Sequence, residues 1–476
     1  MANGSAYLGR TISSGSTTTK ATFSCWLRRC EVSTNIYHGL FGMRAQSTND
    51  QHLVQILLQK DSNGSGLQIG VFDSSGGTSC NKRTERALRD VTAWYHIVIT
   101  IDTTLATAED RCKIYINGER ETAFVSSHNT NFAQNDTISF FNNHSNNQQL
   151  VGAFTFTGNT TITNKLNGSL THVHACDGYA YQASSFGETD ATTGIWKPKT
   201  SPTVNYGTNG FFLKMDNSAN MGLDSSGNSN NLTTNGTIIQ TKDTPSNVFA
   251  NINFLFRNRF ANTATLTNVN STMTTGPTDG DKALLLATHG FTKGKWYWEC
   301  KVGTNKAQIG FAKPGISAFT DFYGSNNPSR GFGVYGDNGN VYYDGTNTAY
   351  GSSWTTNDII MVALDMDNKL AWLGKNGTWF NSATQTEIEN GTATNDLTTK
   401  MGTQQNLTGS TIFPMFADQT GLGDMGLSVN FGNGYFGTTA VTSAQNPDDG
   451  IGIFEYDVPA GYRALCTKSI NAEEYS

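Results

Sequence analysis

RDVTAWYHIVITIDTTLATAEDRCKIYINGERE, residues 89–121, contains the strongest structural signal in this chain. Residues 95–101 place apolar or β-branched side chains on both sides of an extended backbone, which predicts a β-strand covered on both faces. A second apolar alternation follows over 112–116, and Asn117 and Gly118 supply the positive φ angles that a tight hairpin needs. The stretch therefore predicts strand, loop, strand and hairpin turn.

The same pattern recurs far downstream. NDIIMVALDMDNKLAWLGKNG, residues 357–377, again holds two apolar strands around an Asp-rich turn and again ends in Asn-Gly, at Asn376 and Gly377. The repetition predicts two similar β-sandwiches in series. Gly118 and Gly377 are both expected to have positive φ.

Length and composition support an all-β chain. At 476 residues the chain is long enough for two to four domains, and 50 glycines with only 15% charged residues are typical of many short strands joined by tight turns. Residues 84–90 are the one segment with helical character, a turn or two long. The predicted fold class is two tandem antiparallel jelly-roll β-sandwiches.

Charge and cysteine content exclude several classes of function. A net charge of -6, with no clustered Lys and Arg, argues against nucleic-acid binding. The seven cysteines include no C-x-x-C pair, so they predict buried free thiols in a reducing cytosol rather than a disulfide framework or a structural zinc site. No signal-peptide core and no run of 18 apolar residues occurs, so we expect no membrane insertion.

Five phrases in the first half carry a family resemblance. They are AYLGRT (6–11), ATFSCWLRR (21–29), the stretch 89–121, LNGSLTHVHACDGYAYQASSFGETDATTGIWKPK (166–199) and GLDSSGNSNNLTTNG (222–236). In this order they resemble the laminin-G-like, concanavalin-like domains of tailed-phage structural proteins. The resemblance spans nearly the whole first half of the chain.

Six phrases in the second half are similar to a SPRY domain, itself two antiparallel sheets packed face to face. They are GKWYWECKVG (294–303), IGFAKPG (309–315), GFGVYGDNGNVYYDG (331–345), the stretch 357–377, FPMFA (413–417) and VNFGNG (429–434). The predicted division is a laminin-G-like sandwich (1–235), a connector (236–263), a SPRY-like sandwich (264–437) and a closing segment (438–476).

The resemblance implies a non-enzymatic virion structural protein. It would be a fibre or decoration protein on the phage tail or capsid surface, made in the host cytoplasm, and it would contribute to recognition of host-surface glycans. The implied partners are other virion proteins, host glycans and further copies of the chain in a homo-oligomer. The alternatives are a purely architectural virion protein, or a carbohydrate-binding lectin or polysaccharide hydrolase on a jelly-roll scaffold.

Glycoside hydrolysis needs two carboxylates beside the scissile bond. In concanavalin-like hydrolases these lie on one strand as E-x-D-x-x-E, and this spacing is absent here. The nearest strings, at 188–190 and 455–457, lack the third carboxylate. The sequence therefore predicts no catalytic residues.

His172, His174 and Cys176 are the weak candidates for metal ligands, because period-two spacing puts all three on one face of a strand. A solvated or interface-facing histidine pair is the favoured alternative, so no metal site is predicted. Calcium stays open, and no other cofactor is expected. The residues that could hold calcium through loop oxygens are Asp102, Asp110, Asp224 and Asn228, although Asx-turns explain them equally well.

The aromatic residues fall into two groups. Those inside apolar strand phrases predict core packing: Trp26, Trp94, Trp296, Trp298 and Trp372. Those in or near glycine-rich loops of the SPRY-like half are candidates for glycan or partner binding, with packing as the alternative: Tyr323, Tyr335, Tyr342, Tyr343, Tyr350 and Trp354. We therefore hypothesise that the SPRY-like loops carry recognition, and that the first sandwich and the closing segment carry assembly.

Overall fold

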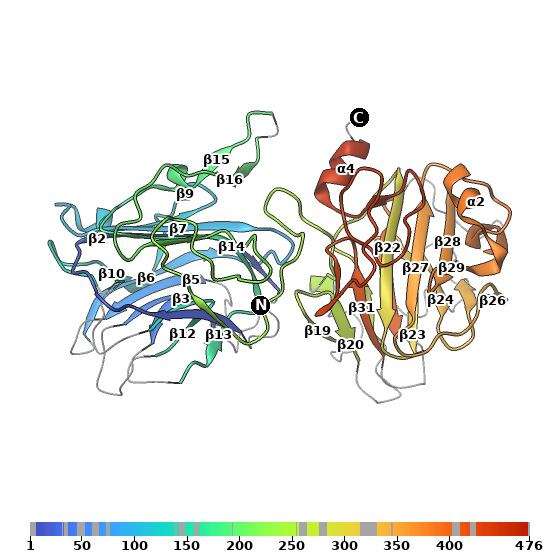
Figure 1. The fold of residues 1–476 in the computed structure, drawn as a ribbon, viewed down its shortest axis with the longest axis horizontal. Coiled ribbons are helices and arrows are strands. Elements are labelled where there is room, and N and C mark those ends of the chain that lie inside the picture. The colour runs from blue at the N-terminus through green and yellow to red at the C-terminus, as the bar shows by residue number, and fades with distance from the viewer. Residues whose placement is uncertain are drawn as a thin grey trace. The chain divides into compact units, whose positions relative to one another are not determined.

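The computed structural model describes most of the chain, which divides into two compact units (Figure 1). The described residues are 6–30, 32, 37–44, 53–59, 66–72, 77–138, 140–141, 148–156, 161–192, 194–253, 255–256, 264–275, 283–314, 331–343, 346–401, 410–418 and 425–474. The first unit is Met1–Gln240 with Thr244–Ser246, and the second is Thr241–Asp243 with Asn247–Ser476. Isolated bridges of Phe249 to Cys466 and of Ile252 to Ala287 tie part of the predicted connector to the second unit.

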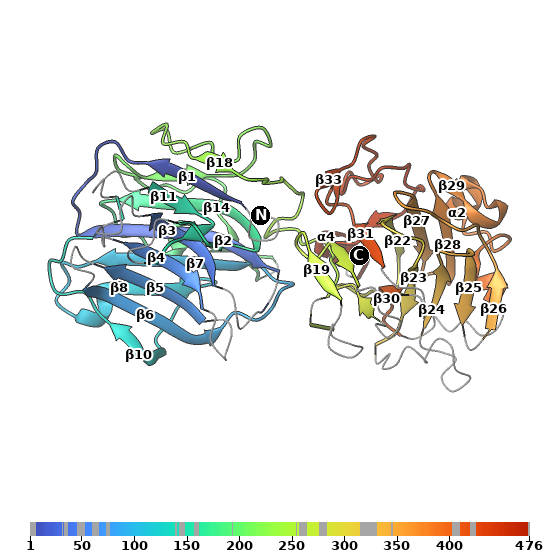
Figure 2. The ribbon, with the colours of Figure 1, turned by 90° about the horizontal axis from the view of Figure 1, so that it is seen from below.

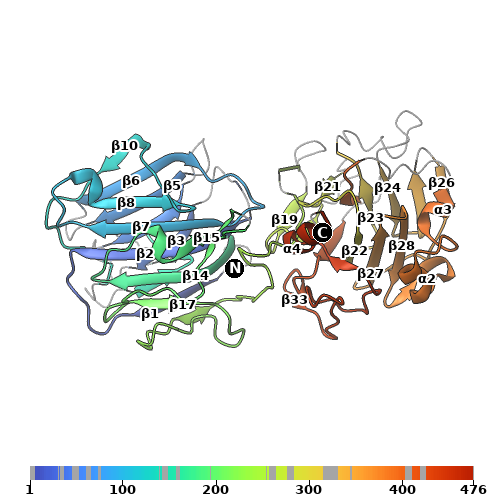
Figure 3. The same ribbon diagram turned by 90° about the horizontal axis from the view of Figure 1, so that it is seen from above.

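Two antiparallel sheets form the first unit. The larger sheet (Figure 2) has the order β10 (Phe124–Thr130), β6 (Thr78–Ala87), β5 (Gly66–Phe72), β4 (Val54–Leu58), β3 (His38–Arg44), β11 (Gln148–Val151), β1 (Tyr7–Thr11) and β18 (Thr233–Asn235). The six-stranded sheet (Figure 3) has the order β17 (Phe211–Leu213), β14 (Gly168–Asp177), β2 (Lys20–Arg29), β7 (Tyr95–Asp102), β8 (Cys112–Ile116) and β9 (Glu119–Arg120). Two short hairpins join β12 (Ala153–Phe154) to β13 (Asn164–Lys165) and β15 (Gly187–Thr189) to β16 (Trp196–Pro198).

The core of the first unit lies between these sheets. In β7 the side chains of Ile97, Ile99 and Ile101 enter this core, while His96 and Val98 on the opposite face are also fully buried. The prediction that this strand is covered on both faces is therefore confirmed. Other residues of the same unit cover the outer face of β7, which carries His96 and Val98.

The second unit repeats the two-layer arrangement. One sheet has the order β19 (Thr265–Thr267), β20 (Thr272–Thr274), β31 (Gly426–Asn430), β22 (Lys295–Val302), β27 (Ile359–Asp365), β28 (Leu370–Lys375) and β29 (Thr378–Trp379), with β34 (Arg463–Ala464) parallel to β22. The other has the order β21 (Leu284–Leu286), β30 (Phe413–Asp418), β23 (Ala307–Ala312), β24 (Gly331–Tyr335), β25 (Asn340–Tyr343) and β26 (Thr346–Ala349). A small hairpin joins β32 (Tyr435–Phe436) to β33 (Thr439–Ala440).

The tryptophans predicted as core residues are all buried in the two units: Trp26, Trp94, Trp296, Trp298 and Trp372. Trp296 and Trp298 fill the space between the two sheets of the second unit, whereas Trp372 lies on the outer side of its sheet. Burial of such large side chains is a principal source of stability in both units.

The two Asn-Gly hairpins have the same geometry. Gly118 and Gly377 have φ of 86° and 83°, which confirms the prediction of positive φ at both. In the first hairpin His96 N–H donates to Asn117 Oδ1 at 2.8 Å. In the second, Ile359 N–H donates to Asn376 Oδ1 at 2.8 Å. Each asparagine therefore bonds the start of β7 or β27, the neighbouring strand in the sheet, and so ties the turn to it.

In the described residues the helices are few and short, and the helical segment predicted from the sequence is not among them. The prediction of helical character at 84–90 is wrong, because β6 runs to Ala87 and pairs with both β5 and β10. Pairing on both edges outweighs the local propensity. The described helices are α2 (Gln385–Asn390), α3 (Leu397–Met401) and α4 (Thr467–Glu474), with short 3₁₀ turns at Ala108–Asp110, Ala183–Ser185 and Phe380–Ser382.

The all-β fold class is confirmed by the sheets of both units. All seven cysteines are buried and free, as the sequence predicted. Within the described part of the chain, no helix combines the length and the apolar character required to cross a bilayer.

Candidate functional site

The outer face of the six-stranded sheet in the first unit is covered by residues 178–207. This segment includes the β15–β16 hairpin, which lies outside the layer formed by β7 and β14 (Figure 1). Phe186 of the segment packs with Val98 and Cys176 of the sheet in a second apolar cluster, separate from the main core. The sheet face on which a jelly roll could expose a long groove is thus occupied by the chain's own residues.

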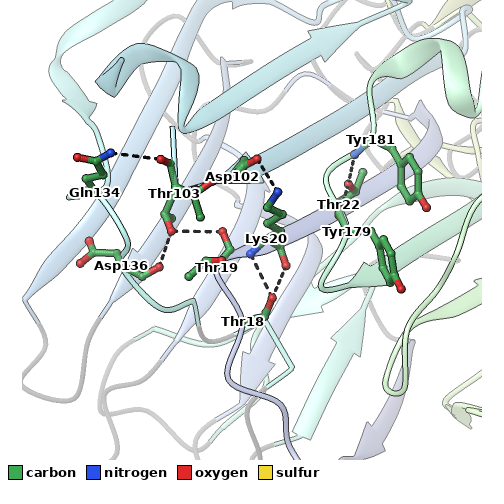
Figure 4. A network of polar contacts seen from close by, with 11 residues as sticks. Thr18, Thr19, Lys20, Thr22, Asp102, Thr103, Gln134, Asp136, Tyr179 and Tyr181 are labelled. Carbon is green, nitrogen blue, oxygen red and sulfur yellow. Dashed lines mark hydrogen bonds and ion pairs between the residues drawn. The ribbon is translucent and has the colours of Figure 1, made fainter. Parts of the chain in front are cut away.

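Two buried threonines fix the first part of this covering segment, and Figure 4 shows one of them, Thr22, bonded to Tyr181. Thr22 in β2 donates from Oγ1 to the carbonyl oxygen of Tyr179 at 2.9 Å and accepts from the N–H of Tyr181 at 2.8 Å. Thr100 in β7 donates from Oγ1 to the carbonyl oxygen of Tyr181. These bonds satisfy both hydroxyls and the backbone above them, so residues 179–181 have one fixed path over the sheet.

Tyr179 and Tyr181 point to the same side of the segment (Figure 4). Their rings are nearly parallel, at 12°, with centroids 6.0 Å apart. Asn205 fixes both hydroxyl oxygens, because its Nδ2 donates to Tyr179 at 2.9 Å and its backbone N–H donates to Tyr181 at 2.8 Å. Tyr179 remains 38% exposed, so its ring is partly open to solvent although its position is fixed.

An ion pair lies one step farther along the same sheet face. Lys20 Nζ is 3.2 Å from Asp102 Oδ2, and the two residues face one another across β2 and β7 (Figure 4). Partial burial opposes ionisation of Asp102, but hydrogen bonds from Thr104 and Lys20 outweigh it and lower the pKa of the carboxyl group. This ion pair lies on the face of β2 and β7 that also carries Thr22 and Thr100.

A histidine between two tryptophans occupies the other part of the face. The ring of His96 stacks on Trp26 with centroids 4.7 Å apart, and Trp196 donates from Nε1 to His96 Nδ1 at 3.0 Å. Burial lowers the pKa of His96 to about 3, with a smaller contribution from His172. His96 is thus a neutral packing residue. Trp196, which belongs to the covering segment, packs over its ring.

The structure does not keep His172, His174 and Cys176 in the alignment that the sequence predicted, and the rings of both histidines lie against Phe212. A bulge interrupts β14 between Thr171 and His174, and His172 has a φ of 47°, so the predicted period-two alignment breaks there. The ring of His174 stacks on Phe212 at 4.0 Å, and Cys176 belongs to the outer apolar cluster. Burial lowers the pKa of His174 and raises that of Cys176.

The residues considered for calcium are dispersed, and each has its own protein partners. Asp102 pairs with Lys20, Asp110 with Arg120 and Lys113, Asp224 accepts from the backbone of Phe212 and Asn230, and Asn228 donates to Gly207 and Gly210. In the described ranges, no three His, Cys, Asp or Glu side chains are grouped so that they could hold a metal ion. The Asx-turn interpretation fits Asp102 and Asp224, whose carboxylates accept from backbone N–H groups two residues ahead.

The aromatic residues selected in the SPRY-like half are mostly packed. Tyr350 and Trp354 belong to the main core of the second unit, where Tyr350 accepts from the N–H of Leu373 at 3.0 Å. Tyr335 is also buried and stacks on Tyr342 with centroids 3.8 Å apart. Tyr343 packs against the core, and Tyr323 lies outside the described residues. Buried rings have no free face for a ligand, so Tyr342 and Tyr343 are the described members of this group that retain partial exposure.

The closing segment of the second unit covers its sheet in a similar way. Residues 454–466 pack an apolar cluster, including Phe454 and Tyr462, on the outer side of β22 and β27. Glu299 in β22 is fully buried there and accepts from the N–H groups of Glu455 and Tyr456, each at 2.9 Å, and from the hydroxyl of Tyr297. Burial outweighs these hydrogen bonds and raises the pKa of Glu299 to about 7.

The sequence analysis missed Tyr179, Tyr181 and Asn205. A signal for the two tyrosines was present, because the phrase D-G-Y-A-Y at 177–181 follows a strand and places two aromatic side chains on one side of an extended backbone. No comparable signal marks Asn205, which is far from them in sequence and meets them only in the folded unit.

Comparisons with known proteins agree with the two-part architecture. Residues 3–159 match the Concanavalin A-like lectin/glucanases superfamily, and residues 295–415 match the SPRY domain. No curated protein matches the chain.

Solved structures with similarity to the chain include the SPRY domain of human HERC1, with 20% identity, a TM-score of 0.25, and coverage of 33% of this chain and 87% of that one. They also include a heptameric SAP-like pentraxin from Limulus polyphemus, with 13% identity, a TM-score of 0.26, and coverage of 37% and 71%. With the two family matches and the two sandwiches together, the chain carries a concanavalin A-like, laminin-G-type domain followed by a SPRY domain.

Proposed function

We propose that this chain is a non-enzymatic structural protein of a tailed-phage virion that contributes to recognition of host-surface glycans. The virion role rests on the ordered sequence phrases that resemble phage structural proteins. The recognition role rests on the lectin-type architecture of the first unit and on its exposed, rigidly held aromatic surface. The proposed location is a fibre or decoration on the tail or capsid surface.

One observation favours a binding protein over a hydrolase: the outer face of the six-stranded sheet is covered. Hydroxyl groups of Thr22 and Thr100, which an open groove would leave free, are hydrogen-bonded to the covering segment. On β2, β7 and β14, which the structure describes in full, Asp102 is the carboxylate on this face, and it is paired with Lys20. Acid catalysis of glycoside cleavage needs a second carboxylate across the substrate.

We expect no enzymatic cleavage of polysaccharide. Incubation of the protein with laminarin, agarose, alginate or host lipopolysaccharide should release no reducing ends above a heat-inactivated control. Reproducible release that disappears when one Asp or Glu is replaced would show that the protein is a hydrolase instead.

We expect the chain in purified phage particles, at a fixed copy number set by the symmetry of a fibre or of the capsid surface. Imaging of particles labelled with an antibody against the first unit, together with quantitative mass spectrometry, measures both position and copy number. Particles that lack the chain would contradict the virion role. If normal particles contain the chain, and particles made without it still adsorb normally to host cells, the purely architectural alternative would be supported.

A further inference from the structure

We propose that Tyr179 and Tyr181 form the stacking subsite of the glycan-binding surface, and that its ligand is a neutral glycan built of pyranose rings. This inference rests on the proposed function. Recognition then lies in the covering segment of the first unit. The sequence had suggested the SPRY-like half instead.

The rigidity of the pair is the first argument. The backbone of residues 179–181 is held by Thr22 and Thr100, and both phenol oxygens are held by Asn205. Asn205 is itself fixed, because its Oδ1 accepts from the N–H of Gly207 at 2.9 Å. Rings that are already ordered lose little conformational freedom on binding, which is the property expected of a recognition site.

The amphipathic character of the pair is the second argument. A pyranose ring has an apolar C–H face and a rim of hydroxyl groups, so it can stack on an aromatic ring and hydrogen-bond at its edge. Both tyrosine oxygens act as acceptors from Asn205, so the hydroxyl protons are not used in these bonds and can be donated to sugar oxygens. The Lys20–Asp102 pair adds a donor and an acceptor on the same face.

Charge decides between neutral and acidic glycans. Lys20 and Asp102 neutralise one another, and Asn205, Thr22 and Thr100 are uncharged. The chain as a whole has a net charge of -6, which repels polyanionic chains at a distance. A site without a surplus cation therefore favours neutral sugars.

Affinity electrophoresis tests the inference, with laminarin and agarose as neutral probes and alginate as the polyanionic probe. The unaltered chain should be retarded by a neutral probe. Tyr179→Ala with Tyr181→Ala should weaken that retardation by about tenfold or more in apparent Kd, as expected for two lost stacking contacts. Tyr179→Phe should keep most of it, because the ring remains.

Phe156→Ala is the matched control, since Phe156 lies in the same unit and is 39% exposed against 38% for Tyr179. This variant should bind as the unaltered chain does. If the double variant melts at a lower temperature than the unaltered chain, binding is compared for the single variant Tyr179→Ala instead, because Tyr179 is the more exposed ring.

The outcomes separate the site from the function. Retardation of the unaltered chain and of the double variant to the same extent would overturn the placement at Tyr179 and Tyr181 while leaving glycan binding intact. Retardation by alginate alone would overturn the neutral ligand. Retardation by none of the probes would overturn both the proposed glycan recognition and this subsite. A double variant that keeps glycan binding but is lost from particles would identify the pair as a protein contact.

Discussion

Ionisation of Glu299 should destabilise the second unit by about 3 kcal/mol as the pH rises from about 4.5 to above 7, and Glu299→Gln should remove that contribution. The folded pKa of Glu299 is about 7, against an ordinary value of 4.5. A raised folded pKa means that the folded protein binds the proton more tightly than the unfolded chain does. The stabilisation is therefore complete below about pH 4.5 and is lost as the pH rises through 7.

The cause is the position of Glu299 under the closing segment. Its carboxyl group is shielded from water and contacts the backbone of Glu455 and Tyr456, so ionisation transfers a charge into an apolar layer. The negative charge of Glu455 adds to this effect, and the hydrogen bond from Tyr297 opposes it. Ionisation should loosen the closing segment where the segment crosses β22.

Urea unfolding across pH 4 to 9 measures the effect, and hydrogen exchange in the peptide that spans 451–462 localises it. The difference in unfolding free energy between the unaltered chain and Glu299→Gln should change with pH, beyond any constant offset from the new amide. Tyr297→Phe should move the midpoint to higher pH, because it removes a hydrogen bond that favours the charged form. Parallel pH profiles for the unaltered chain and Glu299→Gln would contradict the interpretation.

Valine at either hairpin glycine should destabilise its own unit by about 1–3 kcal/mol through backbone strain alone, with a further cost from crowding. A Cβ at Gly118 would lie 3.1 Å from ring atoms of Trp196, and a Cβ at Gly377 would lie 3.1 Å from ring atoms of Tyr456. Each ring belongs to the segment that covers the outer sheet face. Thermal melting of Gly118→Val and Gly377→Val measures the total.

Two other glycines separate strain from crowding. Gly227 in the first unit and Gly450 in the second have φ of 93° and 69°, and a Cβ on either would meet nothing within 4 Å. Gly227→Val and Gly450→Val should therefore cost less than the matching hairpin variants. Melting temperatures for Gly118→Val and Gly377→Val that equal that of the unaltered chain would contradict the assigned hairpin geometry.

The fold was largely predictable because its signals are local. Period-two alternation in 95–101 and 357–377 indicated the central strands, and the Asn-Gly pairs located the turns within a few residues of them. The capping box of α2, in which Thr384 and Glu387 bond each other's backbone, was equally local but was overlooked as a T-x-x-E phrase.

The candidate site was not predictable in the same way, because burial depends on distant segments. Tyr350 and Trp354 sit among glycines, which suggested exposed loops, yet packing against the rest of the second unit encloses both. Residues 84–90 were likewise assigned by local propensity, whereas residues 84–87 are the end of β6, which pairs with two neighbouring strands.

The sequence by itself determined the two sandwiches, their order, their hairpins and their core tryptophans, because alternation and turn chemistry act between near neighbours. Only the tertiary structure decided which sheet face is open and which aromatic rings reach solvent. An alternating strand has the same pattern whether its outer face meets water or another part of the chain. Thr22 and Tyr179 are 157 residues apart in sequence, and the hydrogen bond between them exists only because folding brings the covering segment back across the sheet.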